Sequence, residues 1–306
     1  MTVSLTSLKQ SLHAGLTAVA QGADPALIYH SNAQLWASHP FNQLQGLEAI
    51  RRVWSQLRYA LPDMQRRDQI FVAGNSKADA RMPDDLEGRV LVASMGHYQG
   101  SFLNDLCGIP ATHGVVNLRV CEVHHLVEGK IAQSYVMLDL LDLMGQAGCW
   151  PIAPSLGAEG MWSGPATNDG VRLHTSDPSG GQTAFDTVIA MHNALGSFDG
   201  KSLDSMQHGA YWADNFLWYG PSGIGQTRGM TGFRAHHQIP FLVGYPDRKG
   251  AGHYVRIGDG DYVVTGGWPS VTGTHLGEWL GLPATGKHIE MLSLIHISEP
   301  TRLAEI

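Results

Sequence analysis

The stretch GTHLGEWLGLPATGK, residues 273–287, has a counterpart in GSFLNDLCGIPATHG, residues 100–114. The two segments align without a gap at an offset of 173 residues, and Gly, Leu, Gly, Pro, Ala and Thr recur in register. A second pair lies upstream, GLEAIRRVW from Gly46 and GMTGFRAHH from Gly229, in the same order. Two shared motifs in one order indicate two copies of one domain.

Each copy contains the same succession of expected elements. In the first copy, apolar residues at helical spacing predict helices near 8–19 and 47–61, and strands are expected at 69–73, 89–99, 115–127 and 130–138. Glu128-Gly129 predicts a tight hairpin between the last two strands. In the second copy we expect helices from Phe185 and over 230–237, and a strand over 211–218. Helices followed by a mostly antiparallel sheet predict an α+β fold, with a pocket at the open end of the curved sheet.

Composition marks the domain boundaries. Residues 149–181 are rich in Gly, Pro and Ser and lack periodicity, which predicts a linker between a first domain over 1–148 and a second over 182–291. Trp150 and Trp162 are expected to fasten this linker to a domain surface.

The last residues differ in character from the rest. The segment LSLIHISEPTR, residues 292–302, is what a transposon adapter used for sequencing libraries encodes, so we interpret 292–306 as a non-native tail. The second copy would then lack about 30 residues of the first, which contain two strands and a closing segment. A natural, divergent terminus is the alternative.

Overall composition argues against several classes of protein. The 306 residues carry a net charge of −7 and no Lys/Arg-rich run, so nucleic acid is not an expected partner. The three cysteines follow no metal or disulfide spacing, which indicates reduced thiols and a cytoplasmic location. No signal-peptide pattern opens the chain, and no apolar run reaches the roughly 20 residues needed to cross a bilayer.

No metal or organic cofactor is expected either. The adjacent pairs His124-His125 and His236-His237 point in diverging directions on a strand or a helix. The zinc-protease HExxH pattern and the glycine-rich nucleotide-binding patterns are missing from the sequence.

The sequence resembles the SnoaL-like polyketide cyclase family of the nuclear transport factor 2-like superfamily. GTHLGEWLGLPATGKHIEM is similar to the family's GTHxGxxxGxPATGK turn, and EGKIAQSYVMLDLLDLMGQAG is similar to its closing strand. The resemblance covers most of both copies and leaves out the linker. It implies tandem cone-shaped domains, each with N-terminal helices packed on a curved, mostly antiparallel sheet. The superfamily also holds isomerases, dehydratases, hydrolases and binding proteins, so the reaction is poorly specified.

Asp139 is the first candidate catalytic residue. A strand period of two places Tyr135, Met137 and Asp139 on one face, and apolar neighbours would desolvate the carboxylate and suit it to acid/base chemistry. The resemblance implies that Asp139 matches the family's acid/base Asp, which moves a proton during an intramolecular aldol closure. Capping of the following segment is the alternative, because Asp is a preferred N-cap. Tyr135 and Met137 are expected to contact the substrate.

His275 is the second candidate catalytic residue. It lies in the GTH turn, where the resemblance implies a histidine that lines the pocket, while the first copy has Phe102. An ordinary histidine at a strand end is the alternative. Trp218 and Trp268 are expected to contact a flat substrate, with core packing as their alternative.

Together these features predict a small-molecule enzyme that needs no cofactor and resembles polyketide cyclases, including the ester cyclases. The expected partner is an apolar or aromatic small molecule, and a homo-oligomer or pairing of the two copies stays open. The alternatives are a non-catalytic binding or dimerisation module, and a dehydratase or hydrolase on the same fold. A filled cone would favour the binding module.

Overall fold

The computed structural model describes residues 4–77 and 86–298, which fall into two compact units. Unit 1 comprises Met1–Gly74, Arg89–Pro151 and Met161–Ser176, and unit 2 comprises Asn75–Gly88, Ile152–Gly160 and Asp177–Ile306. Residues of the expected linker therefore belong to both units. No helix in the described part of the chain has the length and apolar character of a membrane span.

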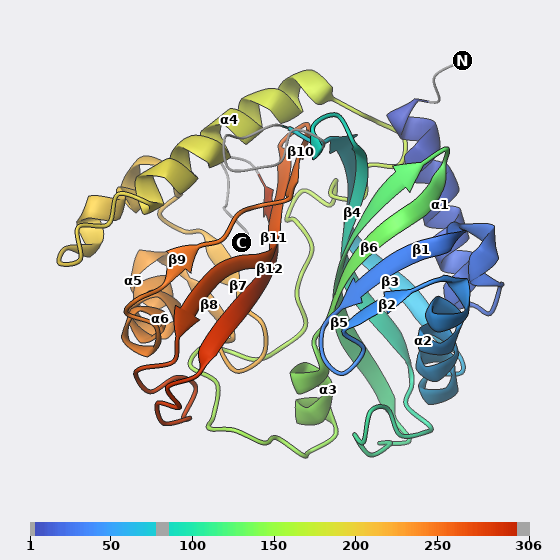
Figure 1. Cartoon of the computed structure of the whole chain (residues 1–306), viewed down its shortest axis with the longest axis horizontal. Coiled ribbons are helices and arrows are strands. Elements are labelled where there is room, and N and C mark those ends of the chain that lie inside the picture. The colour runs from blue at the N-terminus through green and yellow to red at the C-terminus, as the bar shows by residue number, and fades with distance from the viewer. Residues whose placement is uncertain (1–3, 78–85, 299–306) are drawn as a thin grey trace. The chain divides into compact units, whose positions relative to one another are not determined.

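Unit 1 is a six-stranded sheet with two long helices packed on one face (Figure 1). The Ser4 side chain accepts the Ser7 N–H and so begins the first helix as its N-cap. Leu12 and Leu16, one turn apart on this helix, join Ile50 of the second helix in the core. The elements are α1 (Leu5–Ala20), β1 (Tyr29–Ala37), β2 (Gln43–Gln45), α2 (Leu47–Ala60), β3 (Gln65–Asn75), β4 (Val90–Ser101), β5 (Val115–Val127), β6 (Lys130–Leu138) and α3 (Leu140–Gln146).

The strands of unit 1 follow the order β2-β1-β6-β5-β4-β3. The β1–β6 pair is parallel, and the β1–β2, β4–β5 and β5–β6 pairs are antiparallel. The two strands expected over 115–127 and 130–138 are confirmed, and the hairpin residues Glu128 and Gly129 both have a positive φ. The expected α+β class, helices on a mostly antiparallel sheet, is therefore confirmed in unit 1.

Unit 2 begins with α4 (Pro178–Leu195), which lies over β10 in Figure 1. Gly181 of this helix packs against the backbone of Gly258, and a Cβ on Gly181 would come within 2.3 Å of that backbone, so the close approach requires glycine. The other helices and strands are β7 (Leu217–Tyr219), β8 (Gln226–Arg228), α5 (Gly229–Phe233), α6 (Ile239–Gly244), β9 (Lys249–Gly250), β10 (Val255–Asp259), β11 (Tyr262–Thr274) and β12 (His288–Ser298).

The strand expected over 211–218 is wrong for most of its length. Residues 208–210 form a 3-10 turn, and pairing with β8 begins only at Leu217. The physical reason is packing, because the Trp212 indole N–H donates to the sulfur of Met191 at 2.7 Å and its ring packs against Phe216 and Phe233.

Several backbone pairings of unit 1 have equivalents in unit 2, and both partners of a pair are shifted along the chain by the same number of residues. Pairs in the long hairpin and in the turn that follows it are separated by 173 residues, and pairs in the short strands are separated by 183. The matched pairs are Ser101↔Val115 with Thr274↔His288, Leu106↔Ile109 with Trp279↔Leu282, and Gln34↔Gln45 with Leu217↔Arg228.

The helical segment that starts at Gly229 in unit 2 is one residue longer than the segment that follows Gly46 in unit 1. Gly46, the N-cap of α2, and Gly229, the first residue of α5, are 183 positions apart. The helix-end residues Ala60 and Gly244 are 184 apart, and their carbonyls accept the N–H of Leu103 and Leu276 respectively. Between α5 and α6 the chain forms a π-helical turn, Arg234–Gln238. A π-turn holds one residue more than an α-turn, and such turns are frequent at functional sites.

The strand β12 runs further than we expected from the sequence. It continues through Ser298 and pairs with β11 along the way. The physical reason is that LSLIHIS contains two leucines and two isoleucines, and β-branched residues such as isoleucine favour strands. In the described residues β12 has no strand joining it to β7, whereas β6 joins β5 to β1 in unit 1.

Candidate functional site

Asp139 lies at the end of β6 and begins α3. Its Oδ1 accepts the Asp142 N–H at 3.0 Å, which is the hydrogen bond of a helix N-cap, and its Oδ2 lies 3.3 Å from Nη2 of Arg119. The fully buried Arg119 also contacts Asp142 at 3.0 Å, and its guanidinium lies over the Trp162 ring. These are the contacts expected if Asp139 caps helix α3, which was the alternative to a catalytic role.

Tyr135 and Met137 lie on the face of β6 opposite to Val136 and Leu138. Val136 and Leu138 belong to the core beneath α1 and α2, and successive side chains of a strand point to opposite faces. The Tyr135 ring meets the Trp36 ring edge-on, with 5.5 Å between centroids. The face that we expected to line a pocket is therefore the face turned away from the two helices of unit 1.

The face beneath the helices carries a buried polar cluster that the sequence analysis missed. Glu122 of β5 is at its centre, with its carboxylate 2.6 Å from Nη1 of Arg66. The carboxylate also accepts hydrogen bonds from the Tyr98 hydroxyl at 2.5 Å and the Ser94 hydroxyl at 3.0 Å. Asp68 pairs with the same arginine at 2.8 Å.

The electrostatics of this cluster favour ionised Glu122. Burial alone would raise the pKa of Glu122, but the Arg66 guanidinium and the hydrogen bond from the Tyr98 hydroxyl hold it well below its usual range. Burial raises the pKa of nearby Tyr29 to about 12, so that phenol stays protonated. Because both oxygens of Glu122 already have partners, the cluster stabilises the interior of unit 1 and offers no obvious place for a substrate.

His275 lies in the turn after β11 with 5% of its surface exposed. Its Nδ1 is 3.1 Å from Oγ1 of Thr285, and its ring stacks on Tyr245 with 5.5 Å between centroids and 29° between planes. Its Nε2 is buried and has no hydrogen-bond partner within the described chain. The matching residue of unit 1, Phe102, is fully buried in the core. Unit 2 thus presents a buried, oriented imidazole nitrogen where unit 1 has only hydrocarbon.

Trp218 belongs to a column of aromatic rings that ends at His275. Between them lie His237, Phe241 and Tyr245, with successive centroids 4.3, 5.6, 5.5 and 5.5 Å apart. The three middle residues come from the π-turn, α6 and the helix end at a spacing of four, so they share one helix face. Desolvation lowers the pKa of His237 to about 4, so this ring is neutral at pH 7.

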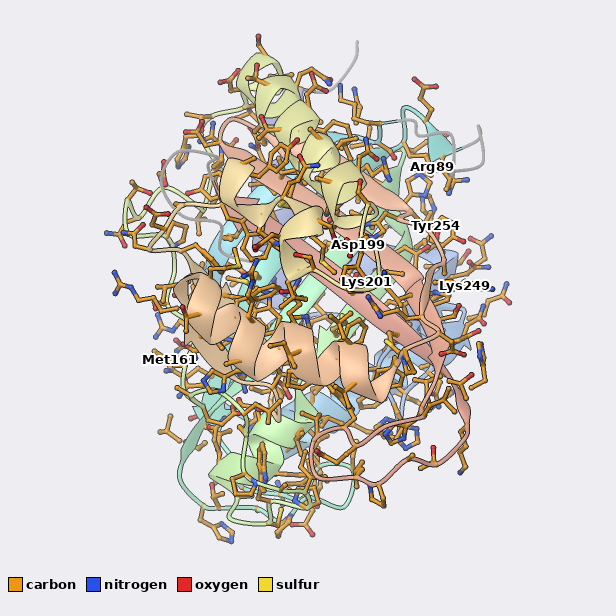
Figure 2. All side chains as sticks on the ribbon, turned by 90° about the vertical axis from the view of Figure 1, so that its left-hand side faces the viewer. Arg89, Met161, Asp199, Lys201, Lys249 and Tyr254 are labelled. Carbon is orange, nitrogen blue, oxygen red and sulfur yellow. The ribbon has the colours of Figure 1, made fainter. Side chains whose placement is uncertain are left out.

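A half-buried cation lies beside the column. The Arg248 guanidinium is 5.9 Å from the centroid of Phe241 and 5.6 Å from that of Phe198, and burial lowers its pKa. Phe198 belongs to the loop after α4, where Figure 2 labels Asp199 and Lys201. An arginine over aromatic faces is suited to an anionic or enolate-bearing ligand.

Trp268 lies within β11, whereas His275 follows the end of that strand. It sits where the pairing of β11 with β12 shifts register between Gly267 and Val271, and it is half-buried. The structure therefore brings Trp218 and His275 into one column of ring contacts, whereas Trp268 lies at the register shift of β11.

Neither a metal site nor the open pocket of unit 2 adds to the candidate site in the described residues. Within residues 4–77 and 86–298, no three His, Cys, Asp or Glu side chains are grouped to hold a metal ion. An open pocket of about 500 Å³ lies beside α4 and includes Phe185, Asp186 and Lys77, but it contains none of the expected site residues.

Among the comparisons with known proteins, only the comparison with solved structures finds proteins similar to this chain. No protein-family model matches the chain, and no curated protein matches it. Similar solved structures include IdmH from Streptomyces antibioticus, a proposed polyketide cyclase, at 17% identity and TM-score 0.36, with 46% of this chain and 98% of that chain covered. A proposed SnoaL-like polyketide cyclase from Jannaschia sp. CCS1 has 15% identity and TM-score 0.35, with coverages of 49% and 98%. TsrD from Streptomyces laurentii has 18% identity and TM-score 0.37, with coverages of 48% and 99%.

Two of these three solved structures are described as proposed polyketide cyclases, and each of the three aligns with about half of this chain. Another similar structure, from Catenulispora acidiphila, is described as having a ketosteroid isomerase-like fold. At these identities and TM-scores, neither the substrate nor any catalytic residue follows from the likeness, so the functional conclusion rests on the side-chain contacts.

Proposed function

We propose that this chain is a small-molecule enzyme of the SnoaL-like cyclase type, with its reactive centre in unit 2 and His275 as the proton carrier. One observation carries the proposal: Nε2 of His275 is buried and lacks a partner within the described residues, while Nδ1 is held by Thr285. A buried polar atom without a partner is costly, and such atoms persist where a ligand supplies the missing contact.

The proposed reaction is an intramolecular aldol closure. Nε2 takes a proton from a carbon between two carbonyl groups, and the C–H electron pair becomes an enolate. The enolate carbon forms a bond to a third carbonyl carbon of the same molecule, whose oxygen becomes an alkoxide. The alkoxide then takes the proton from Nε2, which returns the imidazole to its starting state. The site contributes mainly by holding the chain in a reactive conformation.

The surroundings of His275 favour a flat substrate. The Tyr245 ring stacks on the imidazole, Phe241 packs against Tyr245, and the Arg248 guanidinium lies 5.9 Å from the centroid of Phe241. Aromatic faces bind planar molecules, and a fixed cation stabilises the enolate that forms during the reaction.

Asp139 remains the rival proton carrier, as the resemblance implies. Its contacts with the Asp142 N–H and with Arg119 support the capping alternative, which we adopt. We also infer that the units are two copies of one domain, an inference supported by the recurring strand registers. The filled interior of unit 1, with Leu16 and Phe102 at 0% exposure, favours a non-catalytic role for that copy.

The test uses a flat aromatic compound that bears a 1,3-dicarbonyl side chain with a third carbonyl in reach. Chromatography with mass spectrometry follows its conversion to the cyclised isomer of equal mass. His275→Gln is expected to lower turnover by about 10²–10⁴-fold while the ligand still quenches tryptophan fluorescence. His288→Gln, on the exposed start of β12, is the matched control. Loss of turnover in Asp139→Asn with His275→Gln active would transfer the role to Asp139. Ligand binding without turnover in the wild type would favour the binding module.

A further inference from the structure

Two threonines occupy the same place in the matching turns of the two units. Thr112 Oγ1 accepts the Gly114 N–H at 3.2 Å, and Thr285 Oγ1 accepts the Lys287 N–H at 3.3 Å. In unit 2 this hydroxyl has a further contact, because His275 lies across the turn. The two turns therefore share one backbone geometry and differ in what the hydroxyl holds.

When His275 carries a single ring proton, its contact with Thr285 limits which nitrogen that proton can occupy. Thr285 is the hydrogen-bond partner of Nδ1, and Nε2 has none within the described chain. A proton on Nε2 would leave a buried N–H donor without an acceptor, whereas a proton on Nδ1 can be donated to the hydroxyl oxygen. Buried donors without acceptors are rarer than buried acceptors without donors. The hydrogen bond at one ring nitrogen sets which tautomer is present.

We propose that Thr285 is a positioning residue that holds His275 in the Nδ1–H tautomer, which leaves the lone pair of Nε2 as the proton acceptor. The catalytic meaning of this tautomer rests on the proposed function, but the tautomer itself does not. The Thr285 hydroxyl is also compatible with the proposed catalytic cycle. Its oxygen can accept a hydrogen bond from Nδ1–H both when Nε2 is free and when Nε2 carries the substrate's proton. A valine at position 285 keeps the shape of threonine and removes this acceptor.

The tautomer is measured on the full chain with ¹⁵N-labelled histidine by nuclear magnetic resonance at neutral pH. The His275 signals are assigned as those lost in His275→Gln. In the wild type and in Thr285→Ser, Nδ1 is expected to carry the proton. In Thr285→Val, the ring is expected to move toward the Nε2–H form. Thr112→Val removes the equivalent turn hydrogen bond from unit 1, beside Phe102, and should leave the His275 signals unchanged.

An Nε2–H tautomer in the wild type would overturn the proposal, and this result does not depend on any variant folding. An unchanged tautomer in Thr285→Val would overturn it too. With the cyclisation substrate, Thr285→Val is expected to lower kcat by roughly 10²-fold and Thr285→Ser to restore most of it. If the tautomers behave as expected while His275→Gln cyclises normally, the proposed function fails and the positioning role stands.

Discussion

Removing the Asp139 side chain separates helix capping from catalysis. In Asp139→Ala the Asp142 N–H loses its acceptor, which costs about 1 kcal/mol. The fully buried Arg119 loses a carboxylate partner, and complete loss of a buried partner costs about 3–5 kcal/mol. Because Asp142 stays at 3.0 Å, we expect about 1–2 kcal/mol of that amount.

The expected loss is therefore about 2–3 kcal/mol of unfolding free energy, or a fall in Tm of about 4–12 °C for a unit of this size. Differential scanning calorimetry measures it on the full chain. Asp139→Asn retains the cap and is expected to lose about 1 kcal/mol less, because Asn caps helices as well as Asp does. Asp142→Ala is the matched control, since it removes the other carboxylate of Arg119 and leaves the cap in place.

One pattern of results would refute this reasoning. If Asp139→Ala leaves Tm within about 1 °C of the wild type and abolishes cyclisation, Asp139 does not act as a cap. The capping assignment would then be withdrawn and His275 would lose its place as the proton carrier.

Two further outcomes are expected. Glu122→Gln breaks a fully buried ion pair with Arg66 and should destabilise unit 1 in denaturant, by less than the roughly 3–5 kcal/mol of an uncompensated buried charge because Asp68 stays at 2.8 Å from Arg66, whereas Glu128→Gln, on the exposed hairpin, should change it little. Since folding lowers the pKa of Glu122, its contribution is present above the ordinary carboxyl pKa and is lost as pH falls below it, so equal acid sensitivity of wild type and Glu122→Gln would contradict the pairing. A segment patterned on Lys130–Leu138, placed after β12, should slow proteolysis of unit 2 relative to a scrambled segment, because it gives the strand edge a partner; equal cleavage would refute this.

The parts of the fold that the sequence predicts well are those governed by local pattern. The strands around the Glu128-Gly129 hairpin follow from alternation and from the turn residues, which need no distant partner. The direction in which Tyr135 points was harder to predict from the sequence. The two-residue period of a strand identifies which residues share a face, but it does not say which face packs against the helices.

The polar cluster of unit 1 was missed for a related reason. Glu122 is in phase with Leu118 and Val120 on β5, yet a charged residue in a strand ordinarily indicates a solvent-facing position. Its partner Arg66 is 56 residues away in the chain, on β3, so only the folded sheet brings the two charges together. For His275, the resemblance of the GTH turn implied a histidine that lines the pocket, whereas the contact with Tyr245 depends on where the preceding helix ends.

The π-turn of unit 2 has a consequence for which side chains of its helix face the interior. An α-helix advances about 100° per residue, so one inserted residue would put the two halves of the helix out of phase unless the backbone locally widens. Widening at Arg234–Gln238 keeps Phe233 on one side and Tyr245 on the other facing the interior, and it adds a residue between them. Deleting Ala235 would therefore restore a regular helix at the cost of rotating His237 away from Trp218. The contact between Trp218 and His237 therefore depends on the widened turn.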